Sequence, residues 1–450
     1  MDDLFEAARR AADYLEGLAE RNVGPSPVAV GGLDVLDRDL NQAGRPVSEV
    51  LRELDDVGSP ATVGSAGGRY FGFVTGGAHP AGVASAVLAR AWDQNSALAA
   101  MSPAAAAFDT VALRWITQLL GLPATSEGVF VSGASMANTT ALAAARDAVL
   151  ARAGWSVRDD GLRGSPPLTV VVGGEAHSTV FKALRLLGIG ASSLTVVEAD
   201  EQGAMRADRL PTLSGPTIVL TQAGNVNSGA FDPFGAIIEW AAAVDGWVHV
   251  DGAFGLWAAT SPTTRHLVAG VEDADSWATD GHKWLNTPYD SAVAIVRDPD
   301  ALHLSFGVDA PYLPTGLDRN AAMLGPNLSQ RARGVEAWAV LSALGVDGVV
   351  DLVERTCAHA RTMADRLRAE GHRVLNDVVI NQVVVTFGDA TDEIVAAIQA
   401  DGTCWCGATT WRGVPAMRIS VSSWATTAAD IERSIGVILD LAATTLARYE

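Results

Sequence analysis

The residue with the most distinctive chemistry in this chain is Lys283, within the segment Asp275-Ser-Trp-Ala-Thr-Asp-Gly-His-Lys-Trp284. Lysine and arginine together number 32, and only Lys182 and Lys283 are lysines. Arginine stays protonated, whereas lysine can lose its proton and form a Schiff base with an aldehyde. A lysine is most often an ordinary surface cation, but a neighbouring histidine and two tryptophans are not typical of a solvated face. Lys283 is therefore a candidate for covalent chemistry through its amine.

Three further polar side chains follow predicted strands. They are His177, Asn225 and Asp251, at or after the apolar runs 169–173, 217–220 and 247–251. The carboxyl ends of parallel strands lie at one edge of a sheet, and α/β proteins bind ligands there. We therefore expect these side chains to converge with Lys283 at a single edge.

A carboxylate and an anion site beside a reactive lysine suit pyridoxal phosphate. Asp251 would keep the pyridine nitrogen protonated, so that the ring accepts electrons from a carbanion. His177 could stack on the ring, although a lone histidine before a helix is more often structural. In the segment 128–138 a short strand runs through small residues into a helix, which aims backbone N–H groups at a phosphate. Ser135 in that turn could also be a simple helix cap. The resulting hypothesis is that Lys283 carries pyridoxal phosphate.

The bulk composition indicates a globular protein and argues against several partners. A length of 450 residues predicts two or three domains. The net charge of −20 argues against nucleic acid and anionic membrane surfaces. We expect a cytoplasmic protein, because no apolar run is long enough to span a membrane and the acidic N-terminus has no apolar leader. The three cysteines give no disulfide framework, and Cys404-Trp-Cys406 has no second Cys/His pair nearby to complete a zinc site.

The pattern of apolar residues divides the chain into three parts. Residues 1–65 form a helical arm with little core of its own, which we expect to pack on something larger, such as a second subunit. Residues 66–305 alternate strands and helices, which predicts a mostly parallel sheet covered by helices on both faces. Residues 306–450 predict a loop and a small C-terminal α+β domain.

The expected elements follow from spacing and length. Helices are expected at 3–22, 47–55, 103–121, 178–188, 234–245, 331–345, 348–370, 391–401 and 427–448. Strands are expected at 169–173, 193–197, 217–220, 247–251, 275–279, 292–296, 378–386 and 416–421.

Six short motifs occur in order along the chain. They are Phe71-Gly-Phe-Val-Thr75, Val131-Ser-Gly-Ala-Ser-Met-Ala-Asn138, Glu175-Ala-His177, Asn225-Val-Asn-Ser-Gly-Ala-Phe-Asp232, His249-Val-Asp-Gly-Ala253 and His282-Lys-Trp284. Together they resemble the group II pyridoxal-phosphate-dependent amino-acid decarboxylases, which include aromatic amino-acid, glutamate and cysteine sulfinate decarboxylases. The resemblance runs from about residue 65 to the C-terminus. It implies the α/β fold type I architecture of aspartate aminotransferase, with a mostly parallel seven-stranded sheet, and a homodimer with active sites at the subunit interface.

The resemblance also implies roles for individual residues. Lys283 would form the Schiff base with pyridoxal 5′-phosphate, Asp251 would pair with the pyridine nitrogen, and His177 would stack on the ring. These three residues are the expected catalytic set. The residues expected to bind the cofactor are Ala134, Ser135, His177, Asn225, Asp251, Ala253, Asp280, His282 and Lys283. The residues expected near the substrate are Phe73, Thr75, Trp92 and Gln94.

Two departures from the family's pattern bear on the chemistry. Asp280 stands where relatives often carry asparagine close to the phosphate, and an acid there is unfavourable unless it points away or orients His282. Relatives also carry a mobile loop whose tyrosine helps to protonate Cα, whereas the segment 313–326 has none and Tyr312 precedes it. Loss of that proton donor leaves two alternatives open, namely C–C lyase or aldolase chemistry and decarboxylation coupled to oxidative deamination.

The substrate is expected to be an amino acid, and the sequence favours an aromatic one. The aromatic and polar pocket candidates are Tyr70, Phe73, Trp92, Gln94, Tyr289, Trp405 and Trp411. Arg412 and Arg418 would instead bind a distal acid group.

Overall fold

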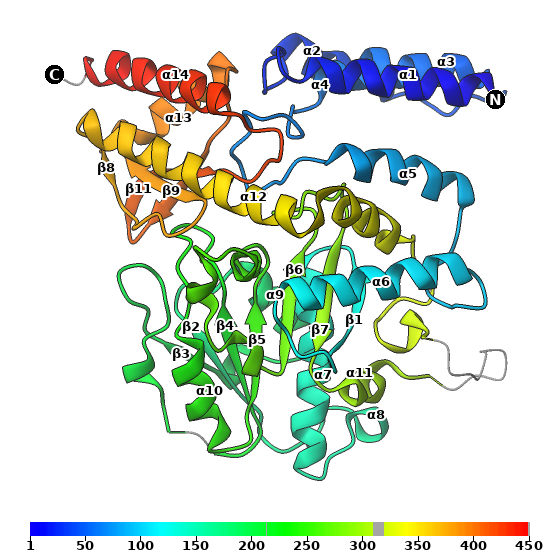
Figure 1. Cartoon of the computed structure of the whole chain (residues 1–450), viewed down its shortest axis with the longest axis vertical. Helices are drawn as coiled ribbons and strands as arrows, with labels where there is room; N and C mark the ends of the chain where they lie inside the picture. The colour runs from blue at the N-terminus through cyan, green and yellow to red at the C-terminus, as the bar shows by residue number, and fades with distance from the viewer. Residues whose placement is uncertain (213, 309–318, 449–450) are drawn as a thin grey trace. The chain divides into compact units, whose positions relative to one another are not determined.

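The chain is arranged in two compact units in the computed structural model, which describes residues 1–212, 214–308 and 319–448 (Figure 1). The larger unit comprises Ala78–Ala358 and Asn376–Gln382, and the smaller unit comprises Met1–Gly77, His359–Leu375 and Val383–Glu450. This grouping follows contacts between residues. The domain boundaries expected from the sequence, after residues 65 and 305, remain a prediction.

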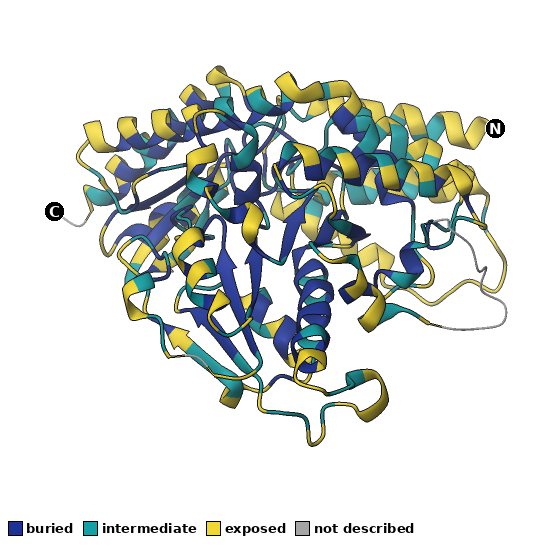
Figure 2. Ribbon diagram, turned by 60° about the horizontal axis from the view of Figure 1, so that its bottom comes forward, coloured by how far each residue is buried: buried dark blue, intermediate teal, exposed yellow. Residues whose placement is uncertain are grey.

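The larger unit is built on a seven-stranded sheet. Its strands are β1 (Glu127–Val131), β2 (Thr169–Gly173), β3 (Leu194–Val197), β4 (Thr217–Gln222), β5 (Trp247–Asp251), β6 (Ser276–Asp280) and β7 (Ala292–Val296). They lie in the order β1-β7-β6-β5-β4-β2-β3, and β7 runs antiparallel to both of its neighbours. The strands other than the edge strand β3 are almost wholly buried, as strands covered on both faces require (Figure 2). The predicted mostly parallel seven-stranded sheet is confirmed.

Helices surround this sheet. They are α5 (Pro80–Trp92), α6 (Pro103–Leu119), α7 (Ala134–Arg152), α8 (Val157–Asp160), α9 (Ser178–Leu186), α10 (Phe234–Ala242) and α11 (Pro299–Phe306). Short 3-10 turns are η3 (Ala191–Ser193), η4 (Ala207–Arg209), η5 (Gly255–Thr260), η6 (Arg265–Val268), η7 (Val271–Asp273) and η8 (Ala321–Met323). The alanine-rich α7 packs against β5, β6 and β7, because small side chains let a helix approach a sheet closely. It begins three residues after β1 ends, so the start of α7 is fixed at the edge of the sheet.

The smaller unit contains a four-stranded sheet in the order β10-β11-β9-β8. Its strands are β8 (Arg373–Val374), β9 (Gln382–Thr386), β10 (Gly407–Trp411) and β11 (Val414–Ser420), and α13 (Thr391–Asp401) and α14 (Ala428–Leu446) pack together beside it. The N-terminal arm consists of α1 (Asp2–Gly17), α2 (Pro27–Gly31), η1 (Gly32–Leu36), α3 (Val47–Glu53), the π-helical turn η2 (Leu54–Gly58) and α4 (Ser59–Ala61). None of these six elements contains a buried residue, and Figure 2 shows the helices near the N-terminus mostly as exposed or intermediate.

Four expected elements differ from the structure, and strand β10 was not expected. The strand expected at 378–386 begins only at Gln382, because Val378 adopts a φ of 52°, which is incompatible with extended backbone. β10 was not predicted, because this edge strand is only partly buried and has no continuous apolar run. The helices expected at 331–345 and 348–370 form one kinked element, α12 (Arg333–Ala369), interrupted at Gly345. The helix expected at 3–22 ends at Gly17. Among the described residues, no helix has the length and apolar character needed to cross a membrane.

Candidate active site

A cavity of about 220 Å³ lies in the larger unit, where the carboxyl ends of β4, β5 and β6 meet the beginning of α7. It is lined by Gly133, Ala134, Ser135, His177, Thr179, Gln222, Gly224, Val226, Asp251, Ala253, Phe254, Asp280, His282 and Lys283. The structure therefore brings together eight of the nine residues expected to bind a cofactor. Each of them follows a strand or starts a helix, which is why segments far apart in sequence meet here.

Lys283 lies in the turn after β6, and its side chain is 20% exposed. Its Nζ is 3.1 Å from Oδ2 of Asp280 and 5.9 Å from the centre of the Phe254 ring. The other lysine, Lys182, is exposed on α9. The two lysines of the chain thus occupy different environments, and only Lys283 faces the cavity.

Asp251 is the last residue of β5 and is buried. Burial raises the pKa of this carboxyl, while the positive charges of His177 and Lys283 and a hydrogen bond from the backbone N–H of Ala253 act in the opposite direction. A carboxylate in such a position can hold a proton on a bound basic nitrogen, because the charged pair satisfies both partners.

Asp280 is the last residue of β6, and its carboxylate lies at the N-terminus of α7, where an anion is favoured. Its Oδ1 accepts a 2.6 Å hydrogen bond from the backbone N–H of Ala134, the first residue of that helix. The same carboxylate contacts Lys283, so it does not point away from the site. The sequence left two arrangements open for Asp280. In the structure its carboxylate is directed toward Lys283 and the backbone N–H of Ala134.

His282 is positioned by its backbone surroundings. Its Nδ1 accepts a hydrogen bond from the backbone N–H of Ser291 at 3.1 Å, and its ring stacks on Tyr289 with 4.3 Å between centroids. Nε2 therefore carries the proton of the neutral ring and lies 3.6 Å from Oδ1 of Asp280. Burial lowers the pKa of His282, which keeps the ring neutral with an N–H donor directed toward the anion site.

His177 precedes α9 and caps it, since its Nδ1 accepts a hydrogen bond from the backbone N–H of Thr179 at 3.3 Å. The rest of the ring lines the cavity. Asn225 behaves differently. Its Oδ1 accepts from the backbone N–H groups of Asn227 and Ser228, and its Nδ2 donates to the carbonyl of Glu175. The Asn225 amide holds its own turn together, and the structure does not place it on the cavity wall.

Sequence reasoning missed several lining residues. The main ones are Thr179, Gln222, Gly224, Val226 and Phe254. A glutamine that ends a wholly buried apolar strand was a usable signal for Gln222. Phe254 carries no such signal, because an aromatic side chain after a strand is ordinarily core.

These groups fit pyridoxal phosphate. Lys283 supplies an amine, Asp251 a buried carboxylate, and α7 a helix N-terminus with His282 as an additional N–H donor. Gly133, Gly224 and Ala253, which line the same cavity, have no side chain larger than a methyl group. The cavity is smaller than the roughly 300–1,000 Å³ of drug-sized ligand sites, as suits a compact cofactor.

The comparisons with known proteins agree with this chemistry. Residues 33–387 match the model of the pyridoxal-dependent decarboxylase conserved domain. The chain belongs to this family. It is 30% identical over 395 residues to tryptophan decarboxylase 1 of Oryza sativa subsp. japonica, which covers 82% of this chain and 76% of the rice protein.

Other relatives agree on the family and differ in name. An aromatic-L-amino-acid decarboxylase of Bacillus atrophaeus is 27% identical over 67% of this chain, which spans 62% of the Bacillus protein. The crystal structure of Oryza sativa TDC with PLP and tryptamine superposes with a TM-score of 0.89 at 25% identity, over 98% of this chain and 97% of that one. The structure of mouse CSAD in apo form has a TM-score of 0.88 at 22% identity, over 98% of each chain, and supports the fold.

This decarboxylase is therefore a fold type I carboxy-lyase that uses pyridoxal phosphate and acts on an amino acid. The predicted family, fold class, cofactor and reaction class are confirmed. The comparisons favour decarboxylation over the aldolase and oxidative deaminase alternatives.

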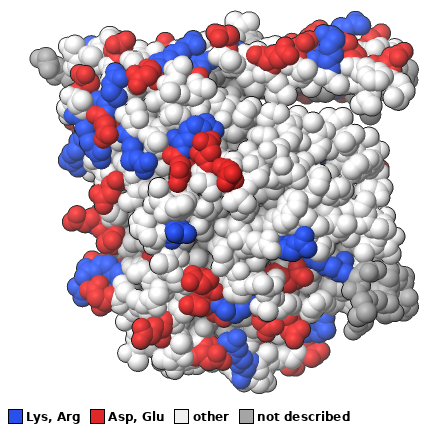
Figure 3. Space-filling view, viewed as in Figure 1, with Lys and Arg blue, Asp and Glu red and all other residues white. Residues whose placement is uncertain are grey.

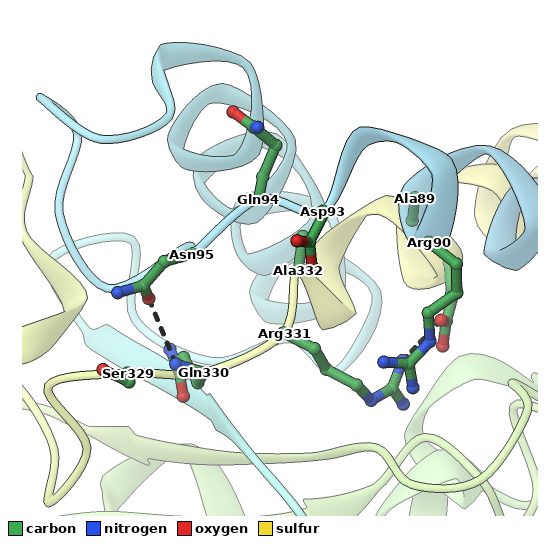
Figure 4. A pocket seen from close by; sticks show the side chains of 10 residues that line it. Ala89, Arg90, Asp93, Gln94, Asn95, Ser329, Gln330, Arg331 and Ala332 are labelled. Atoms are coloured by element: carbon green, nitrogen blue, oxygen red, sulfur yellow. Dashed lines mark hydrogen bonds and ion pairs between the residues drawn. The ribbon is translucent and has the colours of Figure 1, made fainter. Parts of the chain in front are cut away.

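The four residues expected near the substrate do not line the Lys283 cavity. Trp92 is 44% exposed at the end of α5, and its ring centroid lies 6.3 Å from that of Phe108. Gln94 lines a second cavity of about 290 Å³, together with Asn95, Arg331 and Glu336. Figure 4 shows the Gln94 side chain pointing away from Arg331. A substrate role for Trp92 and Gln94 consequently requires a site other than the Lys283 cavity of the same chain.

Phe73 and Thr75 belong to the smaller unit. The Phe73 ring is 64% exposed and lies 5.5 Å from Trp405, while Thr75 is buried. Phe73 and Val74 both have positive φ angles, of 53° and 59°. Two consecutive non-glycine residues in this region are strained, and such strain is concentrated at functional loops. Tyr312, which precedes the loop without a tyrosine, lies outside the described residues.

Proposed function

We propose that this decarboxylase converts an aromatic L-amino acid to its amine and CO2. The observation that carries the proposal is the convergence of the Lys283 amine, the Asp251 carboxylate and the N-terminus of α7 on one cavity. The aromatic preference is supported by the relatives named for tryptophan and aromatic amino acids, and by the aromatic residues Phe73 and Trp405 beside each other in the smaller unit.

Lys283 and Asp251 have the central roles. Bound pyridoxal phosphate withdraws electrons from the Cα atom of the attached amino acid, so that the bond to the carboxylate can break. Lys283 would supply the amine that holds the cofactor covalently. Asp251 would keep a proton on the ring nitrogen, and His177 would pack against the ring.

The phosphate would be held by the N-terminus of α7, with Ala134 and Ser135 donating hydrogen bonds and His282 providing its Nε2–H. Asp280 occupies that position in part, so we propose that its carboxylate gives up the Ala134 N–H to the phosphate while it remains paired with Lys283 or His282. Ala253 would face the ring opposite His177. Asn225 would support the wall indirectly through its turn.

We also propose a homodimer. The arm exposes large apolar side chains, among them Leu4, Phe5, Val28, Leu40 and Leu54. In the larger unit, Val87, Leu88, Trp92 and Met101 are exposed, and Figure 3 shows an almost uncharged area over α5 and α6. Contiguous apolar surface of this kind marks protein–protein contacts. A second subunit would also offer Trp92 and Gln94 a substrate site to line.

A cytoplasmic location is our proposal for the compartment. The three cysteines are all buried free thiols, as a reducing environment favours. The net charge of −20 favours neither nucleic acid nor an anionic membrane as a partner.

The decisive experiment incubates the purified holoenzyme with a panel of aromatic, acidic and aliphatic L-amino acids. CO2, amine, aldehyde and H2O2 are measured separately. We expect equal amounts of CO2 and amine from at least one aromatic substrate, without H2O2. Preferential turnover of an acidic amino acid would overturn the aromatic assignment, and aldehyde with H2O2 would replace amine formation by oxidative deamination.

A further inference from the structure

A chain of buried polar side chains runs from the interior of the sheet toward Asp251. The indole Nε1 of Trp247 is 2.8 Å from Oγ of Ser276, and that oxygen is 2.8 Å from Nδ1 of His249. Nε2 of His249 is in turn 2.9 Å from Oδ1 of Asn138 on α7. All four residues belong to the larger unit and are buried. None of them is in the cavity wall, so the catalytic assignment above leaves this chain unexplained.

The direction of the hydrogen bonds in this network follows from its last member, the Asn138 amide, whose Oδ1 faces His249 and can only accept. An indole N–H can only donate, so Trp247 donates to Ser276 Oγ. That oxygen can accept a second hydrogen bond, so the role of the Ser276 hydroxyl toward Nδ1 of His249 depends on the tautomer of the ring. Burial lowers the pKa of His249 to about 3, so the ring is neutral. The carbonyl oxygen of Asn138 beside Nε2 requires that the single proton of the ring is on Nε2, and Nδ1 then accepts from the Ser276 hydroxyl. His249 therefore donates to Asn138, which fixes the oxygen of that amide toward His249.

The orientation of the Asn138 amide determines where its NH2 group lies. With Oδ1 held by His249, the NH2 group is turned away from the ring. Alternate residues of a strand share a face, so His249 and Asp251 both lie on the side of β5 that α7 covers. Among the described residues, Nδ2 of Asn138 has no hydrogen bond of ordinary geometry. Its acidic neighbour is Asp251, and Asn138 lowers the pKa of that carboxyl.

We propose that Trp247, Ser276, His249 and Asn138 are positioning residues that present an N–H donor to the Asp251 carboxylate and keep it oriented and ionised for the ring nitrogen of the cofactor. The proposal rests on the role proposed for Asp251. It adds that the orientation of one amide, held by the Nε2–H of the buried His249, decides whether Asp251 faces an N–H group or a carbonyl oxygen.

A purely structural network would predict something different. In that case the four side chains only satisfy one another, and their loss would lower stability without changing the cofactor. The two possibilities are separated by a matched pair of variants, Asn138→Thr and Asn138→Val. The two side chains have nearly the same shape, and only threonine has a hydroxyl, which can accept from His249 and donate to Asp251.

The experiment removes the cofactor from each variant, then titrates pyridoxal phosphate back and records the visible absorbance of the lysine-bound cofactor against pH. We expect Asn138→Val to bind the cofactor about tenfold more weakly than Asn138→Thr, which corresponds to about 1.4 kcal/mol. We also expect the pH midpoint of the absorbance change to rise in Asn138→Val, because a less protonated ring nitrogen stabilises the protonated Schiff base. Thermal unfolding of the cofactor-free proteins controls for folding.

Nitrogen NMR of the holoenzyme labelled on its eight histidines tests the direction of the chain. The signals of His249 are identified by their absence from the spectrum of His249→Gln. We expect them to show the neutral tautomer with the proton on Nε2. Ser276→Ala removes the donor to Nδ1, and we expect it to reproduce the midpoint shift of Asn138→Val. A His249 proton on Nδ1 would overturn the proposal.

The remaining outcomes also decide the matter. Equal affinity and equal pH midpoints in the threonine and valine variants would reduce the chain to a structural network and overturn the proposal. The variant Asp251→Asn separates the role proposed for Asp251 from the role proposed for the positioning residues. If it leaves the midpoint unchanged, the role proposed for Asp251 fails; if it moves the midpoint while the matched pair does not differ, only the positioning chain fails.

Discussion

Two of the cavities in the larger unit differ in chemistry more than in size. The cavity of about 290 Å³ is lined by the charged residues Arg90, Asp93, Arg331 and Glu336, and the cavity of about 220 Å³ contains Lys283. In the first, Arg331 pairs with Glu336 and with the Asp290 side chain at 2.9 Å. In the second, one carboxylate contacts the lysine, and a second carboxyl, Asp251, has a pKa raised by burial.

The difference shows that charge alone does not make a reactive site. Arg331 keeps its proton at any physiological pH, so its ion pairs are fixed and hold the start of α12 in place. Lys283 carries an amine, the group that forms a Schiff base with an aldehyde. The ion pairs of the larger cavity therefore have a structural role, whereas the smaller cavity contains groups whose protonation can change during a reaction.

Lys283→Ala should have the largest effect of any substitution in either cavity. Removal of the amine should abolish the visible absorbance of the covalently held cofactor. It should also lower kcat/KM by at least about a thousandfold, equivalent to about 4 kcal/mol. Absorbance spectra and CO2 release measure the two effects. Retention of the absorbance band would mean that the cofactor is attached elsewhere.

Asp251→Asn should have the next largest effect. The amide cannot hold a proton on the ring nitrogen, so we expect kcat to fall about a hundredfold while the cofactor remains attached to Lys283. Stopped-flow measurement of CO2 release gives the rate, and borohydride reduction with peptide mapping reports the attachment. A rate within about threefold of wild type would contradict the assignment.

Asp280→Asn should change cofactor binding in the opposite direction. The carboxylate accepts the Ala134 N–H at the position where a phosphate would lie, so neutralising it removes repulsion between two anions. We expect the Kd for pyridoxal phosphate to fall by about three- to tenfold, equivalent to about 1 kcal/mol. Asp280→Ala is the matched control, since it removes both the charge and the acceptor. Weaker binding in the asparagine variant would mean that the charge of Asp280 is needed to orient His282 or Lys283.

In the second cavity, Glu336→Gln should affect stability alone. Glu336 is buried, and burial raises the pKa of its carboxyl although Arg331 acts to lower it. Loss of the charge-assisted hydrogen bond should lower the free energy of unfolding by about 1–3 kcal/mol. Chemical denaturation measures this, and the cofactor absorbance per folded subunit should equal that of wild type. A changed spectrum would show that the two cavities are coupled.

Asp109→Asn should have the smallest effect on activity and a clear effect on pH dependence. Burial raises the pKa of Asp109 from 3.8 to about 7, and the residue accepts a hydrogen bond from Gly334 next to the second cavity. The folded state therefore holds this proton more tightly than the unfolded chain. That stabilisation is complete below pH 3.8 and is lost as the pH rises through about 7. Unfolding followed at pH 5 to 8 should show a flatter decline in Asp109→Asn, and an unchanged slope would contradict this origin.

Much of the larger unit could be predicted from the sequence because its strands are short, continuous apolar runs. The predicted strands 169–173, 247–251 and 292–296 agree with β2, β5 and β7 to the residue. The meeting of His177, Asp251 and Lys283 at one cavity also follows from the rule that parallel strands end at one edge.

The parts that could not be predicted depend on three-dimensional hydrogen bonding. Asn225 has a suitable side chain and a suitable position after β4, yet the turn that follows uses its amide. The direction of Asp280 depends on α7, which begins 146 residues earlier in the chain. Periodicity and composition contain no information about contacts of that range, and the same holds for the cavity that contains Gln94.

The scarcity of lysine gives this protein an unusual property as a chemical reagent. Lys182 is exposed on α9, whereas Lys283 is largely enclosed, and the chain has no third lysine. An acylating reagent that attacks amines would thus meet one open side chain and one shielded one. The open lysine is an internal standard for reagent strength, and the reactivity of the shielded lysine relative to it reports occupancy of the site. The chain thus contains both the sensor and its reference, and a single mass spectrum would record both.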